Sequence, residues 1–172
     1  MKNCLKISLF GLLLAATVSV NAQTKFGHLN SGNLLSQLPE TKAADEKLKV
    51  YQDSLVKIGE TRAKALQEEV QAFAKRYYEE KTVTPVEAQK KEAEFQQKQQ
   101  ELAAYEDEVR AAVAKKRQDL LEPILDKVQK AITDVGKEGS YTMIFDTSIF
   151  NTILFAQESD DVEALVKKKL GL

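Results

Sequence analysis

The 172-residue chain has very few of the residues from which catalytic and metal centres are usually built. It contains a single cysteine, Cys4, and a single histidine, His28. The chain therefore has too few cysteine and histidine residues for a metal site with the usual ligands. A lone histidine is more often exposed or hydrogen-bonded than a metal ligand or a catalytic base. The sequence also lacks a glycine-rich phosphate loop and the Gly-x-Ser-x-Gly setting of a nucleophilic serine. It predicts no catalytic, cofactor-binding or metal-binding residue and no cofactor, so we expect a protein that is not an enzyme.

An excess of charge of either sign is missing as well. The chain has 25 lysine and arginine residues against 26 aspartate and glutamate residues, which gives a formal net charge of −1. Residues 1–22 contain two lysines and no acidic residue, so without them the formal charge moves from −1 to −3. A nearly neutral chain lacks the basic surface that holds nucleic acid through counterion release. We expect no nucleic-acid partner.

The first residues have the pattern of an export signal. A basic start is followed by an apolar run from Ile7 to Val18 and by the small-residue cleavage sequence Val20-Asn21-Ala22. The apolar run is shorter than the ~20 residues that a membrane-spanning helix needs. We therefore predict that residues 1–22 form a signal peptide that is cleaved after about Ala22 and takes Cys4 with it. The mature chain then has no disulfide and no transmembrane segment.

Proline and glycine are scarce between Pro39 and Val135, which predicts almost uninterrupted helix. The clear break in this stretch is Lys81-Thr82-Val83-Thr84-Pro85. The break ends in a helix start, with Thr84 as the cap, proline at the first helical position and glutamate at the third to close a capping box. The pattern predicts two long helices, Pro39 to Glu80 and Pro85 to Val135, joined by a tight turn.

These helices are too long for a compact domain. At 1.5 Å per residue they would run roughly 63 Å and about 77 Å. A compact domain of ~150 residues has a radius of gyration near 15 Å. The helices must therefore project as an antiparallel hairpin, which we call the prong. Apolar residues at steps of three or four predict a seam between them, and the run Gln96-Gln97-Lys98-Gln99-Gln100 predicts a thin seam at mid-length.

Phe73, Tyr77, Tyr78 and Phe95 gather towards the tip of the prong, and the helical spacing of Phe73, Tyr77 and Phe95 favours a place in the seam. If the turn is centred near Thr82-Val83, Val70 lies across from Phe95. Tyr77 and Tyr78 are adjacent and cannot both face the partner helix, so one of them should be available outside. Two alternatives stay open: these residues only form the seam, or they also contact a partner.

The base of the prong has apolar residues on two sides. Leu120 with Leu121, and Ile124 with Leu125, are adjacent pairs, and adjacent helical residues point about 100° apart. One partner helix cannot cover both members of a pair, so the base must be covered on two sides. Pro123 lies in the same region and is expected to bend the helix or to mark where the prong leaves the body.

The remaining segments predict a small body. Lys25 to Asn30, Tyr141 to Ser148 and Thr152 to Gln157 have the composition of strands, and the last two would form a hairpin over Ile149-Phe150-Asn151. A closing helix is expected from Asp160 to Leu170. Such a unit buries too little apolar surface to be stable alone, so we expect the body to complete itself by oligomerising.

The predicted fold class is therefore mainly α with a small β body, in which a long antiparallel α-helical hairpin projects from a strand-built oligomerisation domain. The prong is expected to cover residues 39–119. The body is expected to be discontinuous and to comprise residues 23–38 and 120–172.

The segment Asp146-Thr147-Ser148 permits one interpretation of the chain as an enzyme. After Met143-Ile144-Phe145 it is similar to the hydrophobic-Asp-Thr-Gly turn of aspartic proteases, which need two carboxylates that share a proton. A serine replaces the glycine and a second lobe is missing. The end of a strand or a turn is the favoured interpretation.

The order of these parts and several local sequences resemble the Skp/OmpH family of periplasmic chaperones. The matching segments are Phe26-Gly27-His28-Leu29-Asn30, Leu34 to Glu40, Met143 to Ser148, Ile153-Leu154-Phe155-Ala156, Asp160-Asp161-Val162 and Leu165 to Leu170. The resemblance covers the whole mature chain, and the terminal segments carry most of it. It implies a periplasmic homotrimer whose strands form a small β-barrel, with three prongs that enclose unfolded outer-membrane β-barrel proteins.

The function expected from this resemblance is that of an ATP-independent holdase, which binds unfolded outer-membrane β-barrel proteins and prevents their aggregation. The residues predicted to bind these clients are Tyr77, Tyr78 and Val83 at the tip. The residues predicted at the oligomer interface are Phe26, Leu29, Leu120, Leu121, Ile124, Leu125, Ile144 and Leu154. The alternative is a coiled-coil structural or adaptor protein that docks on an envelope partner. That function would need a continuous seam, whereas Arg62, Gln99 and Lys116 interrupt this one.

Overall fold

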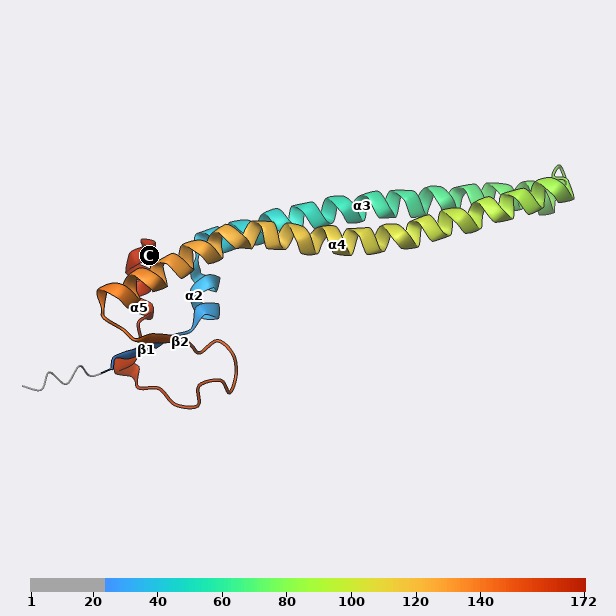
Figure 1. The fold of residues 1–172 in the computed structure, drawn as a ribbon. Coiled ribbons are helices and arrows are strands. Elements are labelled where there is room, and N and C mark those ends of the chain that lie inside the picture. Colours follow the sequence, from blue (N-terminus) through green and yellow to red (C-terminus); the bar gives the residue numbers. More distant parts are fainter. Residues whose placement is uncertain (1–23) are drawn as a thin grey trace, which may run out of the picture.

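The structure is a computed structural model, and it describes residues 24–172. The predicted signal peptide, its cleavage site and Cys4 lie outside these residues. The elements in chain order are β1 (Phe26–Leu29), α2 (Ser31–Gln37), α3 (Pro39–Lys75), the π-helical turn η1 (Arg76–Glu80), α4 (Pro85–Glu138), β2 (Met143–Asp146), the 3-10 turn η2 (Glu158–Asp160) and α5 (Glu163–Leu170). The fold is mainly helical, and α3 and α4 form a long hairpin that projects from a small body made by the last turns of α4 and the other elements (Figure 1).

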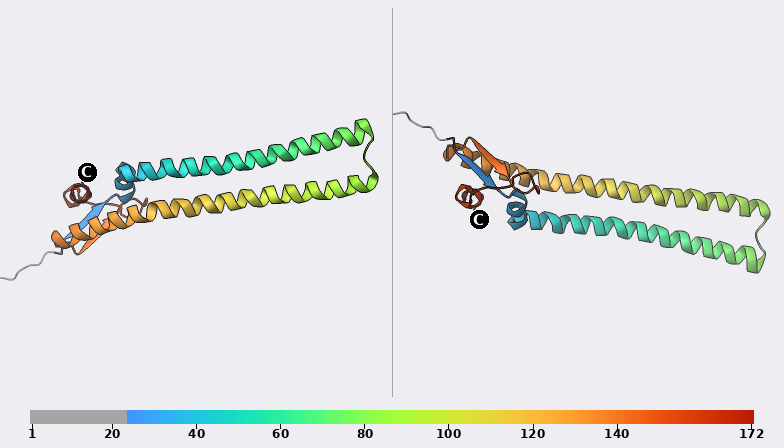
Figure 2. Two further views of the ribbon diagram at one scale, coloured as in Figure 1. Left: turned by 90° about the horizontal axis from the view of Figure 1, so that it is seen from above. Right: turned by 90° about the horizontal axis from the view of Figure 1, so that it is seen from below.

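The turn at the tip begins and ends close to the predicted positions. Thr84 Oγ1 accepts a hydrogen bond from the backbone N–H of Glu87 at 3.2 Å, and proline occupies the first helical position of α4. The Glu87 carboxylate does not complete the capping box, because it pairs with Arg76 of the other helix at 3.2 Å. Before the turn, the last helical residues are wound as η1, and Lys81 ends them in the left-handed conformation with φ 54°. After the turn, α4 runs antiparallel to α3 back to the body (Figure 2).

The body contains a two-stranded parallel sheet. Phe26 of β1 lies opposite Met143 of β2, and Leu29 lies opposite Asp146. The other edge of β1 carries one bridge, from His28 to Asp161. A Cβ atom at Gly27 would lie 2.9 Å from a Val162 methyl carbon, so this close approach of the chain before α5 to β1 requires glycine.

The predicted third strand, Thr152 to Gln157, and its hairpin are wrong for this chain. The chain does turn there, since the Thr152 N–H donates to the Ile149 carbonyl at 3.2 Å and Asn151 adopts a φ of 63°. Its flanks do not pair into strands within residues 24–172. The physical reason is that Leu154 and Phe155 stay 86% and 81% exposed, and a hairpin with no covering layer is at best marginally stable.

The core of the body is built on one face of α4. Its buried residues Ile124, Val128, Ala131 and Val135 recur at steps of four and three, as one helical stripe does. The buried residues that join this stripe come from β1, α2, the start of α3 and the start and middle of α5: Leu29, Leu34, Leu38, Ala44, Val162 and Val166. The stripe starts directly after Pro123, so this proline marks where α4 enters the body, one of its two expected roles.

The prong has no comparable core of its own. Ala44 is the only buried residue of α3, and α4 has none before Ile124; both helices lie wholly within the described part of the chain. The seam side chains, among them Leu48, Leu55 and Leu66, are half-buried. Isolated helices gain most of their stability from packing, so the prong depends on a thin seam and on its anchorage at the base.

Candidate functional site

The predicted tip residues fall into two environments. Tyr78 is 73% exposed and Tyr77 40% exposed, and their rings meet edge to face with centroids 4.9 Å apart. The expectation that one of these adjacent residues lies outside is confirmed. Val83 is half-buried in the turn. The structure thus brings the two tyrosines together in one aromatic contact.

Both tyrosines line a hollow in the distal part of the prong, which we call the distal cleft. Its volume is about 500 Å³, and its lining residues are Val70, Phe73, Ala74, Tyr77, Tyr78, Ala88, Glu92, Phe95, Gln96 and Gln99. Phe73 of α3 packs edge to face on Phe95 of α4 at 5.7 Å and stacks on Tyr77 at 6.2 Å. Phe95 therefore faces Phe73 directly, and Val70 contributes to the same hollow.

Sequence reasoning did not place Phe73 and Phe95 among the client-binding residues. Their helical spacing identified them as seam residues, and they do form the seam. Spacing alone does not reveal that one side of the seam is open, because that depends on the side chains around the rings.

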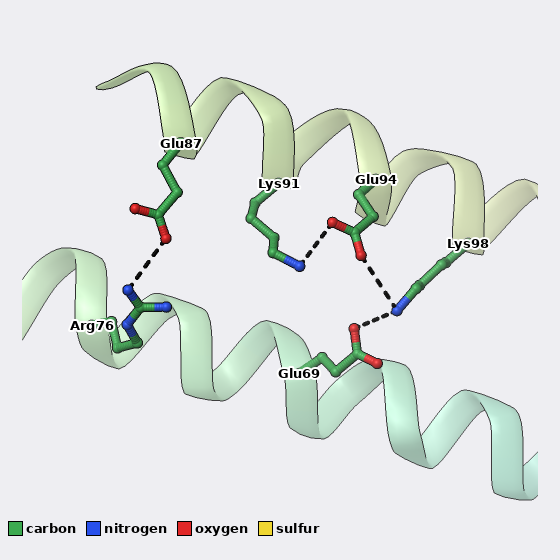
Figure 3. Close-up of polar contacts among 6 residues, drawn as sticks. All are labelled: Glu69, Arg76, Glu87, Lys91, Glu94 and Lys98. Atoms are coloured by element: carbon green, nitrogen blue, oxygen red, sulfur yellow. Dashed lines mark hydrogen bonds and ion pairs between the residues drawn. The ribbon is translucent and has the colours of Figure 1, made fainter. Parts of the chain in front are cut away.

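A row of charged residues lies along the distal prong, and we call it the ion-pair ladder (Figure 3). Two pairs join the helices: Arg76 with Glu87 at 3.2 Å, and Lys98 with Glu69 at 2.5 Å. Within α4, Glu94 accepts from Lys91 at 2.8 Å and lies 3.8 Å from Lys98. The hydrogen bond from Lys91 holds the pKa of Glu94 below its ordinary value. The hydrogen bond to Glu69 raises the pKa of Lys98.

The polar residues that interrupt the seam are not left without contacts. The Arg62 guanidinium lies 4.3 Å from the centre of the Tyr105 ring, and the Tyr105 hydroxyl donates to the Leu55 carbonyl at 2.9 Å. The Lys116 ammonium lies 5.8 Å from the centre of the Tyr51 ring. Cations over aromatic rings keep their charge in water while their stems cover apolar surface. The seam is therefore a mixture of rings and cations and not a continuous apolar stripe.

The predicted interface residues also separate by environment. Leu29 of β1 and Ile124 of α4 are buried in the core cluster of their own chain. Leu120, Leu121 and Ile144 are half-buried against that core. Phe26, Leu125 and Leu154 are exposed. This last group has the most free surface for a second copy, and the contact of any residue of the set with a second copy stays a prediction.

The most exposed apolar side chains of the body lie in the segment 147–157, which we call the body loop. Besides Leu154 and Phe155, it carries Ile149 and Phe150, and Phe150 is 90% exposed. The loop leaves the end of β2 and runs out from the body before it returns to α5 (Figure 1). Sequence reasoning assigned part of this segment to a hairpin turn, so Phe150 was not named as an interface residue.

Asp146 holds the end of β2 against the start of α2. Its carboxylate accepts hydrogen bonds from the backbone and the hydroxyl of Ser31, at 3.1 and 2.5 Å, and from the backbone and the hydroxyl of Ser148, both at 2.9 Å. Partial burial acts to raise the pKa of Asp146, but these hydrogen bonds outweigh it and leave the pKa below its ordinary value. A carboxylate held ionised by four donors is a structural tie, so the geometry supports a turn over the aspartic-protease interpretation.

The single histidine, His28, lies in β1 and has a hydrogen-bond partner. The Nε2 atom of His28 lies 2.9 Å from the Gln157 carbonyl oxygen, so this histidine is hydrogen-bonded. In the described range 24–172, no three His, Cys, Asp or Glu side chains are grouped so that they could hold a metal ion. None of the helices in that range has an apolar stretch long enough to cross a membrane.

We predict that Asp146→Asn weakens the body by about 1 kcal/mol at pH 7, because an amide nitrogen cannot accept from the serine hydroxyls. The folded-state pKa lies below the unfolded value near 3.8, so the carboxylate stabilises the fold above about pH 4 and loses this effect as pH falls further. Urea unfolding at pH 7 and near pH 3 measures this. The difference between parent and variant should shrink at low pH, whereas exposed Asp53→Asn should change little at either pH.

Comparison with known proteins gives a family and a fold. A family model described as outer membrane protein (OmpH-like) matches residues 25–170. No curated protein matches the chain. Among solved structures, the crystal structure of a Caulobacter crescentus protein assigned as an OmpH-like outer membrane chaperone superposes with a TM-score of 0.72. The two chains are 17% identical, and the match covers 87% of this chain and 85% of that one. At this identity the likeness shows a common fold.

Proposed function

The chain belongs to the OmpH-like family of outer membrane proteins, and from this premise we propose that it is an ATP-independent periplasmic holdase for unfolded outer-membrane β-barrel proteins. The observation that carries the proposal is the prong itself: a long hairpin with no buried core that presents half-exposed aromatic rings near its tip. Such a surface offers many weak contacts without one deep, specific site.

The proposed mechanism is capture by several weak apolar and polar contacts from flexible prongs. An unfolded β-barrel chain presents apolar side chains and unpaired backbone groups, which would otherwise aggregate. Each aromatic contact contributes on the order of 1 kcal/mol when it is partly desolvated, and contacts from several prongs add up. Release then needs no nucleotide, because folding of the client elsewhere removes the exposed segments.

The proposed assembly is a homo-oligomer, a trimer by its resemblance to the family, joined through the body. The body loop supports this part of the proposal, since large apolar side chains exposed to water are a typical mark of an interaction surface. Phe26 and Leu125 extend the exposed apolar surface beyond the loop. A second copy would cover side chains that this chain leaves uncovered.

An adaptor that docks on one envelope partner is not favoured. It would need a continuous apolar seam or a single well-defined docking surface. The seam here is interrupted by Arg62 and Lys116 over their rings.

The proposed function predicts that the mature protein keeps a urea-denatured outer-membrane β-barrel protein soluble on dilution, without nucleotide and at a defined stoichiometry. Light scattering during dilution measures aggregation. A stable globular protein such as a serum albumin, added at the same mass, controls for crowding. Aggregation equal to that with the control protein would contradict the holdase function.

The proposed client contacts predict that Tyr77→Ala, Tyr78→Ala and Val83→Ser together weaken client protection several-fold. The loss of three contacts on every prong would reduce the summed attraction without touching the body. Light scattering of the variant alone should show an unchanged oligomer. If the triple variant protects clients as well as the parent does, the tip is not the client surface.

The proposed assembly predicts that Phe150→Ser with Phe155→Ser lowers the molar mass in solution, because the two rings would lose their cover in a partner. Light scattering over a dilution series should show dissociation at a concentration at least tenfold higher than for the parent. Val86→Ser, at an exposed position on the prong, is the matched control. An unchanged mass at every concentration would show that the body loop lies outside the interface.

A further inference from the structure

We propose that the distal prong meets its client with one face only, the face that carries the distal cleft, and that this cleft takes apolar side chains of an extended segment without acidic neighbours. The inference rests on the proposed holdase function. It adds which face of the prong contacts the client and which class of client segment the cleft binds.

The ladder and the cleft lie on different sides of α4. The ladder residues of α4 are Glu87, Lys91, Glu94 and Lys98. Cleft residues of α4 stand one position further along in each case: Ala88, Glu92, Phe95 and Gln99. Neighbouring positions on a helix point about 100° apart. The two sets therefore occupy two separate faces of one helix.

The same division holds on α3. Glu69 belongs to the ladder, and Val70 beside it lines the cleft. Arg76 belongs to the ladder, and Tyr77 beside it lines the cleft. The distal hairpin thus has a ladder face and a cleft face, with the Phe73–Phe95 contact between them.

Charged side chains cover the ladder face over the distal rings, while the hollow that continues this face towards the body is lined by Glu69 and Lys98 themselves. Arg76 and Lys98 reach across to Glu87 and Glu69 and so span the seam there. Lys91 also lies 5.9 Å from the centre of the Phe95 ring and covers that ring from the ladder side. A client's apolar side chain would have to displace these ion pairs to reach the rings from this direction.

The cleft face is open, and its chemistry limits what it can take. Its walls are aromatic and aliphatic, and its polar rim consists of the Glu92 carboxylate and the amides of Gln96 and Gln99. None of the residues that line it is a lysine or an arginine. The amides can pair with the backbone of an extended segment, while an acidic side chain there would meet Glu92 and find no cation. Alternate apolar side chains of a strand-like segment share one face, which suits a shallow apolar cleft.

The experiment uses neighbouring glutamines as a matched pair. Gln96 lines the cleft, whereas Gln97 points away from it and donates to Glu101 at 2.9 Å. The chain beyond Cys4 has no other cysteine, so Gln96→Cys or Gln97→Cys in a chain that starts at Gln23 can each carry one benzophenone label. The probe is a urea-denatured outer-membrane β-barrel protein diluted onto the labelled chaperone. We expect several-fold more photo-cross-linking to the probe from position 96 than from position 97.

Equal yields, or a higher yield from position 97, would overturn the assignment of the face. Cross-links from position 96 to a second copy of the chain in place of the probe would also overturn it, because the cleft would then be covered within the oligomer. Whether the parent protein keeps the probe soluble distinguishes failure of this inference from failure of the holdase function. If solubility is maintained while the face contrast is absent, only this inference fails; if the probe aggregates, the holdase function fails with it.

A second pair of variants tests the cleft by changing its wall while the label stays at position 96. Ala74→Gln fills the cleft wall, and Ala72→Gln places the same side chain on an exposed position outside it. In the Gln96→Cys chain, we expect the first change to cut cross-linking several-fold and the second to leave it unchanged. Helical content by circular dichroism should be the same in both. Equal cross-linking in the two variants would contradict a role for the cleft.

Peptide probes test the class of segment. Two soluble peptides share an alternating Phe-Thr centre and carry either lysines or aspartates at both ends. Competition with the β-barrel probe should be several-fold stronger for the lysine peptide at low salt, and the difference should fall as salt screens Glu92. Equal competition by both peptides would overturn the selection against acidic neighbours.

Discussion

The constraint on which this structure depends is that a hairpin of two helices has only one seam in which to bury apolar surface. Each helix of the prong has a neighbour on a single side, so even its best-placed side chains remain half-buried. In α3 and α4, only Ala44 and the stripe Ile124, Val128, Ala131 and Val135 are buried, because there α2, β1 and α5 add further neighbours. The prong is consequently well anchored at one end and held by small contributions along the rest of its length.

The same constraint explains what lies in the seam. An apolar stripe wide enough to be covered in a globular core would be exposed on a two-helix hairpin, so cations and rings share the interface. Arg62 over Tyr105 and Lys116 over Tyr51 cover aromatic surface while their charges stay in water. The ion-pair ladder adds little energy, because water and salt screen exposed ion pairs. Its two interhelical pairs instead favour one register of α3 on α4 and cover one face of the distal seam.

The local features of the fold could be predicted from the sequence, and the long-range ones could not. The long helices and the start of α4 at Thr84-Pro85 follow from spacing, caps and scarce glycine, which act over a few residues. The pairing of β1 with β2 in parallel, and the failure of residues 152–157 to form a strand, depend on partners far away in the chain. Glu87 shows the conflict directly: a capping box and an ion pair with Arg76 were both available to it, and tertiary packing selected the second. For the candidate site, the exposure of one tyrosine followed from adjacency, but the open face did not, because it depends on where lysine and arginine side chains reach.

A half-buried seam also fits the proposed work of the prong better than a well-packed one would. A side chain that is fully buried must lose all its contacts before it can touch a client, and that loss amounts to about 1.5–3 kcal/mol for a large apolar residue. Tyr77 and Tyr78 are already partly exposed, so they can contact a client while their contacts with Phe73 and with each other persist. Binding then requires little rearrangement of the hairpin, and each contact stays weak enough to be released. Under the proposed function, the thin seam that limits the stability of the prong is the property that lets it hold many different segments.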